Sequence, residues 1–394
     1  MTEESDLAGR MSRLGTESAF EVLAQARALE AEGRTVIHLE IGEPDFDTPA
    51  HIVEAAVDAL HSGYTHYNPA PGYPDVREAI GEFFGRTGRG SYPADRIVIT
   101  PGAKPVMFFT IMALCERGDE VLYPNPGFPM YESIADFAGS TPVAVPLREE
   151  NEFRMDPEEV ASLVTDRTKL LILNSPHNPC GSTLAREELE ALAAIAIERD
   201  LTVFTDEVYW AINYEGEHVS IASIDGMADR TVLLDGCSKT FAMTGWRLGF
   251  AALPPPLVEP VARLIINSVS CTSAFSQRAI LAALTGTWEP IAAMIAEFRK
   301  RRDVIVEGLN RLDGVSCLEP GGAFYVFPNV KALGRPSSEI ASFLLNEAGV
   351  AGLAGTAFGA HGEGYLRFSY ANSIEAIQEA LAAIAVVLPE VARS

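Results

Sequence analysis

The sequence predicts an α/β protein with a mostly parallel central sheet flanked by helices and with a smaller α+β domain. Between residues 96 and 285, short apolar runs alternate with amphipathic helical stretches. Strands that alternate with helices in this way form a mostly parallel sheet that is covered on both faces. After about residue 285 the pattern changes to a long charged helix, two short strands and a final helix, which indicates the smaller domain.

Each strand of the expected central sheet is a short apolar run. The runs cover residues 96–100, 120–123, 141–145, 169–174, 202–206, 231–235 and 249–252. The helices between them are amphipathic. Residues 186–199, for example, bring four apolar side chains onto one stripe: Leu189, Leu192, Ala193 and Ala196. Ligands of such sheets bind at the carboxyl ends of the strands, so we expect the functional residues there.

A chain of 394 residues is long enough for two domains. We expect a large domain at residues 46–285 and a small C-terminal α+β domain at residues 286–394. The elements expected in the small domain are a helix at 290–312, strands within 322–328 and 365–371, and a final helix. Residues 1–45 form an N-terminal arm and small-domain segment, in which we expect a helix at 18–32.

Composition excludes several classes of protein. The net charge of −24 argues against a nucleic-acid binder and against an anionic membrane surface as a partner. No stretch approaches the ~20 apolar residues that span a bilayer, and the acidic N-terminus is unlike a signal peptide. The five cysteines form no C-x-x-C pair, which indicates reduced thiols in a cytoplasmic protein. The seven histidines show no metal-ligand spacing, so no metal is expected.

Lys239 stands out among the five lysines because it lies at the carboxyl end of an expected buried strand, in a turn that contains glycine and serine. Such a lysine is a candidate Schiff-base nucleophile, since partial desolvation and nearby cations lower the pKa of its amine. The alternative is a lysine that simply reaches solvent from the domain surface. Ser238 and Arg247 favour the first interpretation, because a hydroxyl and a guanidinium both suit a phosphate.

A second anion site is expected where the strand at 96–100 turns into a helix. The turn contains Gly102, and Pro105 lies in the first turn of the helix. The backbone N–H groups of Gly102, Ala103 and Lys104 would point out of this helix start towards an anion. The alternative is an ordinary strand-to-helix turn.

Other strand ends offer groups for a flat, polar ring. Asp206 could protonate a ring nitrogen, with Tyr209 near its substituents, although an aspartate here could also cap the next helix. Asn178 lies in a proline-rich, rigid loop and could donate to a phenolate-like oxygen. Phe128 could stack on the ring or belong to the core. Together with Lys239 and the phosphate donors, these groups fit pyridoxal 5'-phosphate.

The order of motifs is specific to one family. The sequence carries "IGEPDFDTP", "YNPAPGYPDVREAI", "NSPHNPCG", "TDEVY", "SKTFAMTGWRLG" and "LRFSYA". From about residue 33 to its end it resembles the class I/II aminotransferases of pyridoxal phosphate fold type I, in the branch of the bacterial aspartate aminotransferases. The resemblance implies an aminotransferase that exchanges amino groups between an L-amino acid and a 2-oxo acid.

The resemblance also implies roles at the cofactor. Lys239 would bind pyridoxal 5'-phosphate covalently and transfer the substrate proton, and Asp206 would pair with the pyridinium nitrogen. Asn178 and Tyr209 would contact the 3-oxygen, while Phe128 would stack on the ring. The phosphate would be held by Ser238, Arg247 and the amides of Gly102, Ala103 and Lys104.

At the substrate, the resemblance implies that Arg367 grips the α-carboxylate beside the Gly42 backbone. Tyr67 would reach the cofactor phosphate of a neighbouring subunit, so a homodimer with shared active sites is expected. Lys104 aligns with a lysine that meets the acidic side chain of the substrate in aspartate-specific relatives. Phe20 favours an apolar side chain instead, and we expect further selectors within residues 268–277.

One loop departs from the family pattern. The usual Asn-Asn-Pro-Thr-Gly is His177-Asn178-Pro179-Cys180-Gly181 here, so Asn178 is kept and two neighbours differ. We expect the two changes to alter packing, with His177 as a candidate for tuning the ring environment. Two other functions stay open at this point: another reaction of the same cofactor, such as β-elimination by a C–S lyase, and a non-catalytic cofactor-sensing module.

Overall fold

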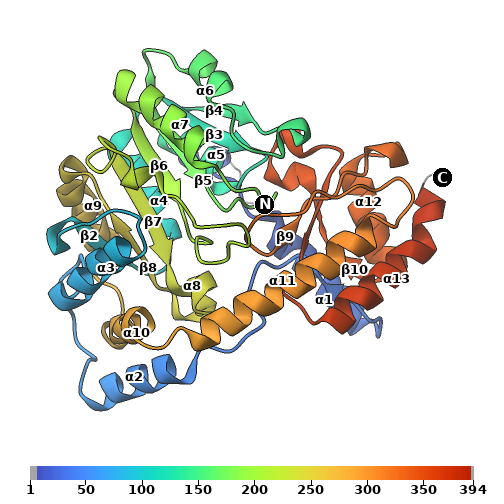
Figure 1. The fold of residues 1–394 in the computed structure, drawn as a ribbon, viewed down its shortest axis with the longest axis horizontal. Helices are drawn as coiled ribbons and strands as arrows, with labels where there is room; N and C mark the ends of the chain where they lie inside the picture. The colour runs from blue at the N-terminus through green and yellow to red at the C-terminus, as the bar shows by residue number, and fades with distance from the viewer. Residues whose placement is uncertain (1–6, 392–394) are drawn as a thin grey trace.

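The computed structural model describes residues 7–391. It contains a large seven-stranded sheet with helices on both faces and a smaller part built from the C-terminal third of the chain (Figure 1). The expected fold class, a mostly parallel central sheet flanked by helices with a smaller α+β part, is confirmed.

All seven expected strands are present in the central sheet. They are β2 (Ile97–Thr100), β3 (Glu120–Asn125), β4 (Thr141–Pro146), β5 (Thr168–Asn174), β6 (Thr202–Asp206), β7 (Thr231–Gly236) and β8 (Gly249–Ala252). Their order across the sheet is β2-β8-β7-β6-β5-β3-β4. Only β8 runs antiparallel to its neighbours, so the carboxyl ends of the other six strands share one edge.

The sheet is buried on both faces because successive side chains of a strand point to opposite sides. In β5, Leu170 and Ile172 pack on one face while Leu171 and Leu173 pack on the other. The first face is covered by α4 (Lys104–Leu114), α5 (Met130–Ala138) and α9 (Pro255–Ser268). The second is covered by α3 (Pro74–Arg86), α6 (Pro157–Leu163), α7 (Arg186–Glu198) and α10 (Ala274–Thr285), with α2 (Ala50–His61) packed on α10.

The smaller part is built around a second core. Its helices are α11 (Glu289–Leu309), α12 (Ser337–Phe343) and α13 (Ile374–Val391). Its antiparallel sheet has the order β11-β12-β9, formed by Leu353–Ala354, Leu366–Ser369 and Tyr325–Val326. The core at this end joins Phe298 of α11 to Phe324 and Ile384, and Leu39 from the N-terminal segment belongs to the same cluster.

The N-terminal segment packs against the smaller part. Helix α1 (Ser18–Ala31) buries Ala26 against Leu345, and β1 (Ile37–His38) pairs in parallel with β10 (Val350–Ala351). The sequence did not indicate this two-stranded pair, because each strand has only two residues. The expected domain limits at 45/46 and 285/286 stay a prediction.

No single helix among residues 7–391 is long and apolar enough to cross a membrane, although α10 and α11, which meet at a bend of 76°, pass such a test as a pair by length and composition.

The double burial of the sheet predicts a large cost for truncation at its centre. Replacing Ile172, which is fully buried in β5, with alanine should lower the free energy of unfolding by about 2–5 kcal/mol, since a cavity is left between two packed layers. The matched control is Ile197→Ala on the exposed side of α7, which should cost less than about 1 kcal/mol. Denaturant unfolding of the two variants measures both values, and equal losses would contradict the layer arrangement.

Candidate active site

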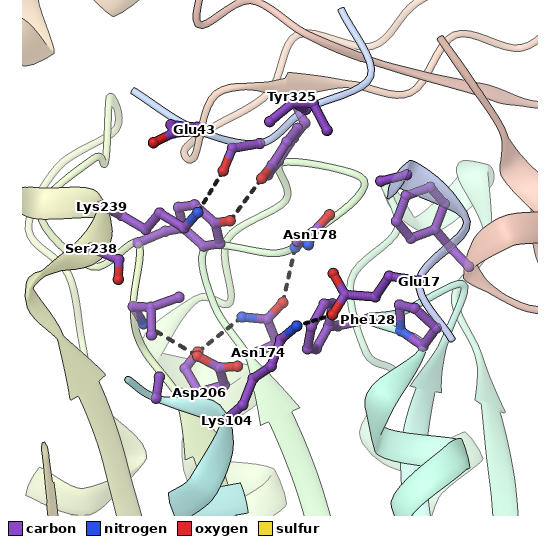
Figure 2. A pocket seen from close by; sticks show the side chains of 18 of the residues that line it. Glu17, Glu43, Lys104, Phe128, Asn174, Asn178, Asp206, Ser238, Lys239 and Tyr325 are labelled. Carbon is purple, nitrogen blue, oxygen red and sulfur yellow. Dashed lines mark hydrogen bonds and ion pairs between the residues drawn. The ribbon is translucent and has the colours of Figure 1, made fainter. Parts of the chain in front are cut away.

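A cavity of about 510 Å³ opens at the carboxyl edge of the central sheet. The ends of β5, β6 and β7 form its floor through Asn174, Asp206 and the turn after Gly236, while Tyr325 and Arg367 of the smaller part line it from the other side. Figure 2 shows the side chains from both parts pointing into this space. The parallel register of the three strands therefore brings residues 174, 206 and 239 together although they are far apart in the sequence.

Lys239 lies in the short helix α8 (Cys237–Thr240) that follows β7, and its side chain enters the cavity. Its Nζ donates to the carbonyl oxygen of Gly42 at 2.5 Å. Burial lowers the pKa of the Lys239 amine to about 8. Lys239 forms no ion pair with any residue of the described chain. Such an amine exchanges protons readily near neutral pH.

Asp206 is buried at the end of β6 and also lacks a cationic partner within residues 7–391. It accepts hydrogen bonds from Tyr131 Oη at 2.9 Å and from the Val208 backbone amide at 3.3 Å. Burial raises the pKa of the Asp206 carboxyl to about 6, and the hydrogen bond from Tyr131 opposes this rise. A buried carboxylate without a counter-charge is suited to bind a protonated ring nitrogen.

A chain of polar groups surrounds Asp206. Asn174 Nδ2 donates to the Asp206 carbonyl oxygen at 2.9 Å, and its Oδ1 accepts from the Asn178 amide at 2.9 Å. The hydroxyls of Tyr209 and Tyr325 lie 2.8 Å apart. These bonds hold Asn178 and Tyr209 in place, and both residues line the cavity.

Arg367 on β12 is buried, and the described chain offers it no carboxylate. Its guanidinium donates to the Glu40 carbonyl oxygen and lies 3.4 Å from Asn178 Oδ1, while its Nε has no partner in the described chain. The ring centroids of Tyr325 and Phe358 lie 4.5 Å and 4.9 Å from its Cζ. This planar fork is therefore held in place and free to take a carboxylate.

Of the residues expected to hold a phosphate, Ala103, Lys104, Ser238 and Arg247 line the cavity, while Gly102 does not. A Cβ at Gly102, whose φ is +94°, would overlap the guanidinium of Arg247, so only glycine permits this approach. The Gly102 amide itself donates to the Thr100 carbonyl oxygen at 2.8 Å, which leaves the amides of Ala103 and Lys104 as the backbone donors. Arg247 forms no ion pair with the described residues.

The part of the cavity at the start of α4 also carries an ion pair that the sequence did not indicate. Glu17, just before α1, pairs with Lys104 at the start of α4 (Figure 2). The Lys104 Nζ also lies 5.6 Å from the centroid of the Phe128 ring. Phe20 lines the same end but remains 61% exposed. Lys104 therefore lines the cavity while its side chain remains 47% exposed.

Some residues that the sequence singled out lie elsewhere. Tyr67 is 90% exposed and does not line the cavity of its own chain, and no residue of 268–277 lines it either. His177 and Cys180 are buried outside the cavity lining, and burial lowers the pKa of His177 to about 3. His177 therefore stays neutral and contacts its own loop, where the Cys180 amide lies 3.5 Å from its Nδ1.

Behind the cavity, a buried ionic cluster joins the ends of β6 and β7. Arg89 is fully buried, with Nη1 at 2.8 Å from Asp235 and at 3.8 Å from Glu207. Glu207 also accepts from Ser220 at 2.6 Å and lies 3.0 Å from His218 Nε2. Since Glu207 follows Asp206 directly and Asp235 lies four residues before Lys239, the cluster fixes both strand ends.

Besides Glu17, the sequence did not indicate three further partners at the site: Tyr131, Tyr325 and Arg89. Tyr131 lies three residues after Phe128, which is the spacing of one helical face and was the only local signal for it. Tyr325 and Arg89 contact groups more than 100 residues away in the chain, so no local pattern could have identified them.

Comparisons with known proteins find a matching family model, similar chains and similar solved structures. The family model described as aminotransferase class I and II matches residues 34–384. The chain is 44% identical to an aspartate aminotransferase of Pyrococcus abyssi over 91% of this chain and 92% of the relative. It is 42% identical to an aromatic-amino-acid aminotransferase of Thermococcus litoralis over 90% and 92%. A solved aspartate aminotransferase of Thermus thermophilus with maleate superposes with a TM-score of 0.93, at 37% identity over 97% of this chain and 99% of that one.

The raised pKa of Asp206 predicts a specific pH dependence of the cofactor-free protein. A carboxyl whose pKa rises from 3.8 to about 6 on folding stabilises the folded state below pH 4, and this contribution is lost as pH rises through 6. In the wild-type protein, this group should lower the free energy of unfolding by on the order of 3 kcal/mol between pH 4 and 6. Asp206→Asn should remove this decline. Denaturant unfolding across this range measures it. Asp200→Asn, at a 94% exposed side chain, should leave the wild-type slope unchanged.

Proposed function

Since this chain belongs to the class I and II aminotransferase family and exchanges an amino group between an L-amino acid and a 2-oxo acid, we propose that it works with pyridoxal 5'-phosphate attached to Lys239. The observation that carries the proposal is a set of charged groups that face one cavity without ionic partners in the described chain: Lys239, Asp206, Arg247 and Arg367. Each of these groups complements one part of the cofactor or of an amino-acid substrate.

The residues present fit the cofactor. Ala103, Lys104, Ser238 and Arg247 line the cavity, and Gly102 lets the Arg247 guanidinium approach the start of α4. Backbone amides, a hydroxyl and a guanidinium together suit a phosphate. The buried Asp206 carboxylate suits the ring nitrogen, and the lowered pKa of Lys239 suits covalent attachment. We propose that Asn178 and Tyr209 donate to the ring oxygen and that Phe128 stacks on the ring.

When bound, the cofactor supplies an electron-withdrawing ring that makes the α-carbon of the amino acid acidic. The chain supplies the proton transfer, the orientation and the exclusion of water. Lys239 Nζ, with a pKa of about 8, takes the proton from the α-carbon and returns it. Asp206 holds the positive charge of the ring nitrogen, and Tyr131 keeps the Asp206 carboxylate in place.

We propose that Arg367 binds the α-carboxylate of the substrate. Its guanidinium is buried and keeps an unpartnered Nε, so a carboxylate would satisfy a group that the folded chain leaves open. The Gly42 carbonyl oxygen accepts from Lys239, and a Cβ at this glycine would overlap the Tyr325 hydroxyl, so glycine lets Tyr325 approach this backbone closely.

We infer that the side-chain pocket accepts acidic substrates through Lys104 without excluding neutral ones. Lys104 is a cation inside the cavity, while Phe20 and Phe358 line the cavity with apolar surface. The relatives named above include both an aspartate and an aromatic-amino-acid aminotransferase, which supports a mixed pocket. Glutamate and 2-oxoglutarate are the pair we propose for one half of the reaction. Neither β-elimination nor a non-catalytic module is favoured.

We further propose a cytoplasmic homodimer with shared active sites. Tyr67 is 90% exposed and does not line the cavity of its own chain. Helix α2 also exposes Val53, Val57 and Leu60. A partner that covers this surface would bury these side chains and could receive Tyr67 at its phosphate site. The five cysteines are all free, which supports a reducing compartment.

Removing the amine of Lys239 tests the cofactor assignment. Lys239→Ala should abolish the visible absorbance band of the attached cofactor and lower turnover by several powers of ten, because both the attachment point and the proton carrier are lost. Lys169→Ala, an exposed lysine at the start of β5, is the control and should retain both. A Lys239→Ala protein that keeps the band and the activity would refute the assignment.

Changing the shape of the cation at position 367 tests substrate recognition. Arg367→Lys should weaken amino-acid binding by at least about tenfold, since an ammonium cannot replace the two parallel hydrogen bonds of a guanidinium. Cofactor affinity, measured separately by absorbance titration, should not change. Unchanged KM values for every amino donor would rule out the role of Arg367.

Solution mass and mixed subunits test the dimer. The wild-type protein should have twice the chain mass of 42.4 kDa at assay concentration. Inactive Lys239→Ala chains mixed with inactive Tyr67→Ala chains should regain part of the activity, because a mixed dimer has one site with both residues intact. An active monomer, or mixed dimers without any recovered activity, would contradict shared sites.

A further inference from the structure

The ion pair between Glu17 and Lys104 lies inside the cavity, where a substrate side chain has to bind. The two residues are 87 positions apart and are brought together by the N-terminal arm. Figure 2 shows their side chains pointing toward one another across the end of the cavity opposite Lys239. The Glu17 side chain is 19% exposed and that of Lys104 is 47% exposed, so the pair is accessible from the cavity.

Glu17 does not fulfil the role that its position in the chain would give it. It is the N-cap residue of α1, where a short polar side chain such as that of serine or aspartate commonly accepts a hydrogen bond from an amide of the first helical turn. Its side chain makes no such bond and extends to Lys104 instead. The arm that carries it is fixed on α5, because Gly15 N donates to Ser133 Oγ at 2.8 Å and Arg13 Nε donates to the Asp136 carbonyl oxygen at 2.9 Å.

Lys104 is a cation in an unfavourable place. It begins α4, and the positive end of a helix dipole disfavours an ammonium group at this position. Glu17 is the only carboxylate that pairs with it in the described chain. With Glu17 in place, this end of the cavity carries no net charge, and the cavity as a whole is rich in apolar side chains: Phe20, Met107, Phe128, Leu353 and Phe358.

An acidic and a neutral side chain therefore meet different conditions. A neutral or aromatic side chain can pack on the apolar wall while the pair stays intact. An acidic side chain can reach Lys104 only by displacing the Glu17 carboxylate, and while both are present the two negative charges repel each other. Because one carboxylate replaces another on the same ammonium, the exchange gains little.

We propose that Glu17 is a specificity-determining residue that competes with the acidic side chain of the substrate for Lys104. The inference rests on the aminotransferase function proposed above and deepens it, because it assigns the balance between acidic and neutral substrates to one residue of the arm. Glu17 acts as an internal substitute for the substrate carboxylate and so restrains binding of aspartate- and glutamate-like ligands. The binding of neutral ligands does not depend on Glu17.

Equilibrium binding to the cofactor-loaded protein tests this without relying on turnover. Succinate carries a second carboxylate and 3-phenylpropionate a neutral ring, and neither has an amino group that could react. Glu17→Gln should tighten succinate binding by about tenfold and change 3-phenylpropionate binding by less than about twofold, as measured by calorimetric titration. Glu21→Gln, which removes the same charge from a residue of α1 outside the cavity, is the matched control and should affect neither ligand.

A double-mutant cycle separates competition from general repulsion. In a Lys104→Ser background, the gain from Glu17→Gln should fall below about threefold, because no ammonium is left to compete for. A full tenfold gain in that background would overturn the proposal, as would equal effects on both ligands or no measurable succinate binding in any variant.

If the variants behave as expected but no amino donor is converted, the proposed function fails and the role of Glu17 stands. If donors are converted but Glu17→Gln has no selective effect, only the role of Glu17 fails.

Discussion

One constraint underlies this structure: several buried or half-buried charged side chains face a single cavity without forming ion pairs. Within residues 7–391, Lys239, Asp206 and Arg367 form no ion pair. A charge that is removed from water without compensation destabilises a fold, so such groups persist only where the surrounding structure holds them in place. The cavity therefore combines a cation for a carboxylate, an anion for a ring nitrogen and an amine of lowered pKa. A ligand that satisfied all three groups would offset the cost of burying these charges.

The rigid layer beneath the cavity makes this arrangement possible. Parallel pairing of β5, β6 and β7 sets the spacing of the strand ends, and burial of the sheet on both faces resists their movement. Arg89 lies below, where it pairs with Asp235 of β7 and reaches Glu207 directly after β6. Burial is the main cause of the raised pKa of Asp206, and the nearby carboxylates of Asp235 and Glu207 add to this rise. Structural support and electrostatic tuning of the site thus come from the same residues.

The sequence predicts the central sheet well because each strand is a local apolar run and side-chain alternation is a local property. It also singles out Lys239, Asp206 and Asn178, since each follows the end of such a run. The contacts that complete the site are different. The hydrogen bond from Tyr131 spans 75 residues and the ion pair of Glu17 spans 87, so they depend on how the arm and the helices pack rather than on any local pattern. The contact expected for the exposed Tyr67 does not follow from a local pattern either, because its expected partner is a surface of another chain.

The most direct test of the central claim is to locate the attached cofactor chemically. The protein loaded with pyridoxal 5'-phosphate would be reduced with borohydride, digested and analysed by mass spectrometry. With five lysines in the chain, the outcome is unambiguous. The account predicts one modified peptide that contains Lys239, because this lysine combines a lowered pKa with a position above Asp206. Stoichiometric modification of Lys104 or of any other lysine, with Lys239 unmodified, would contradict it.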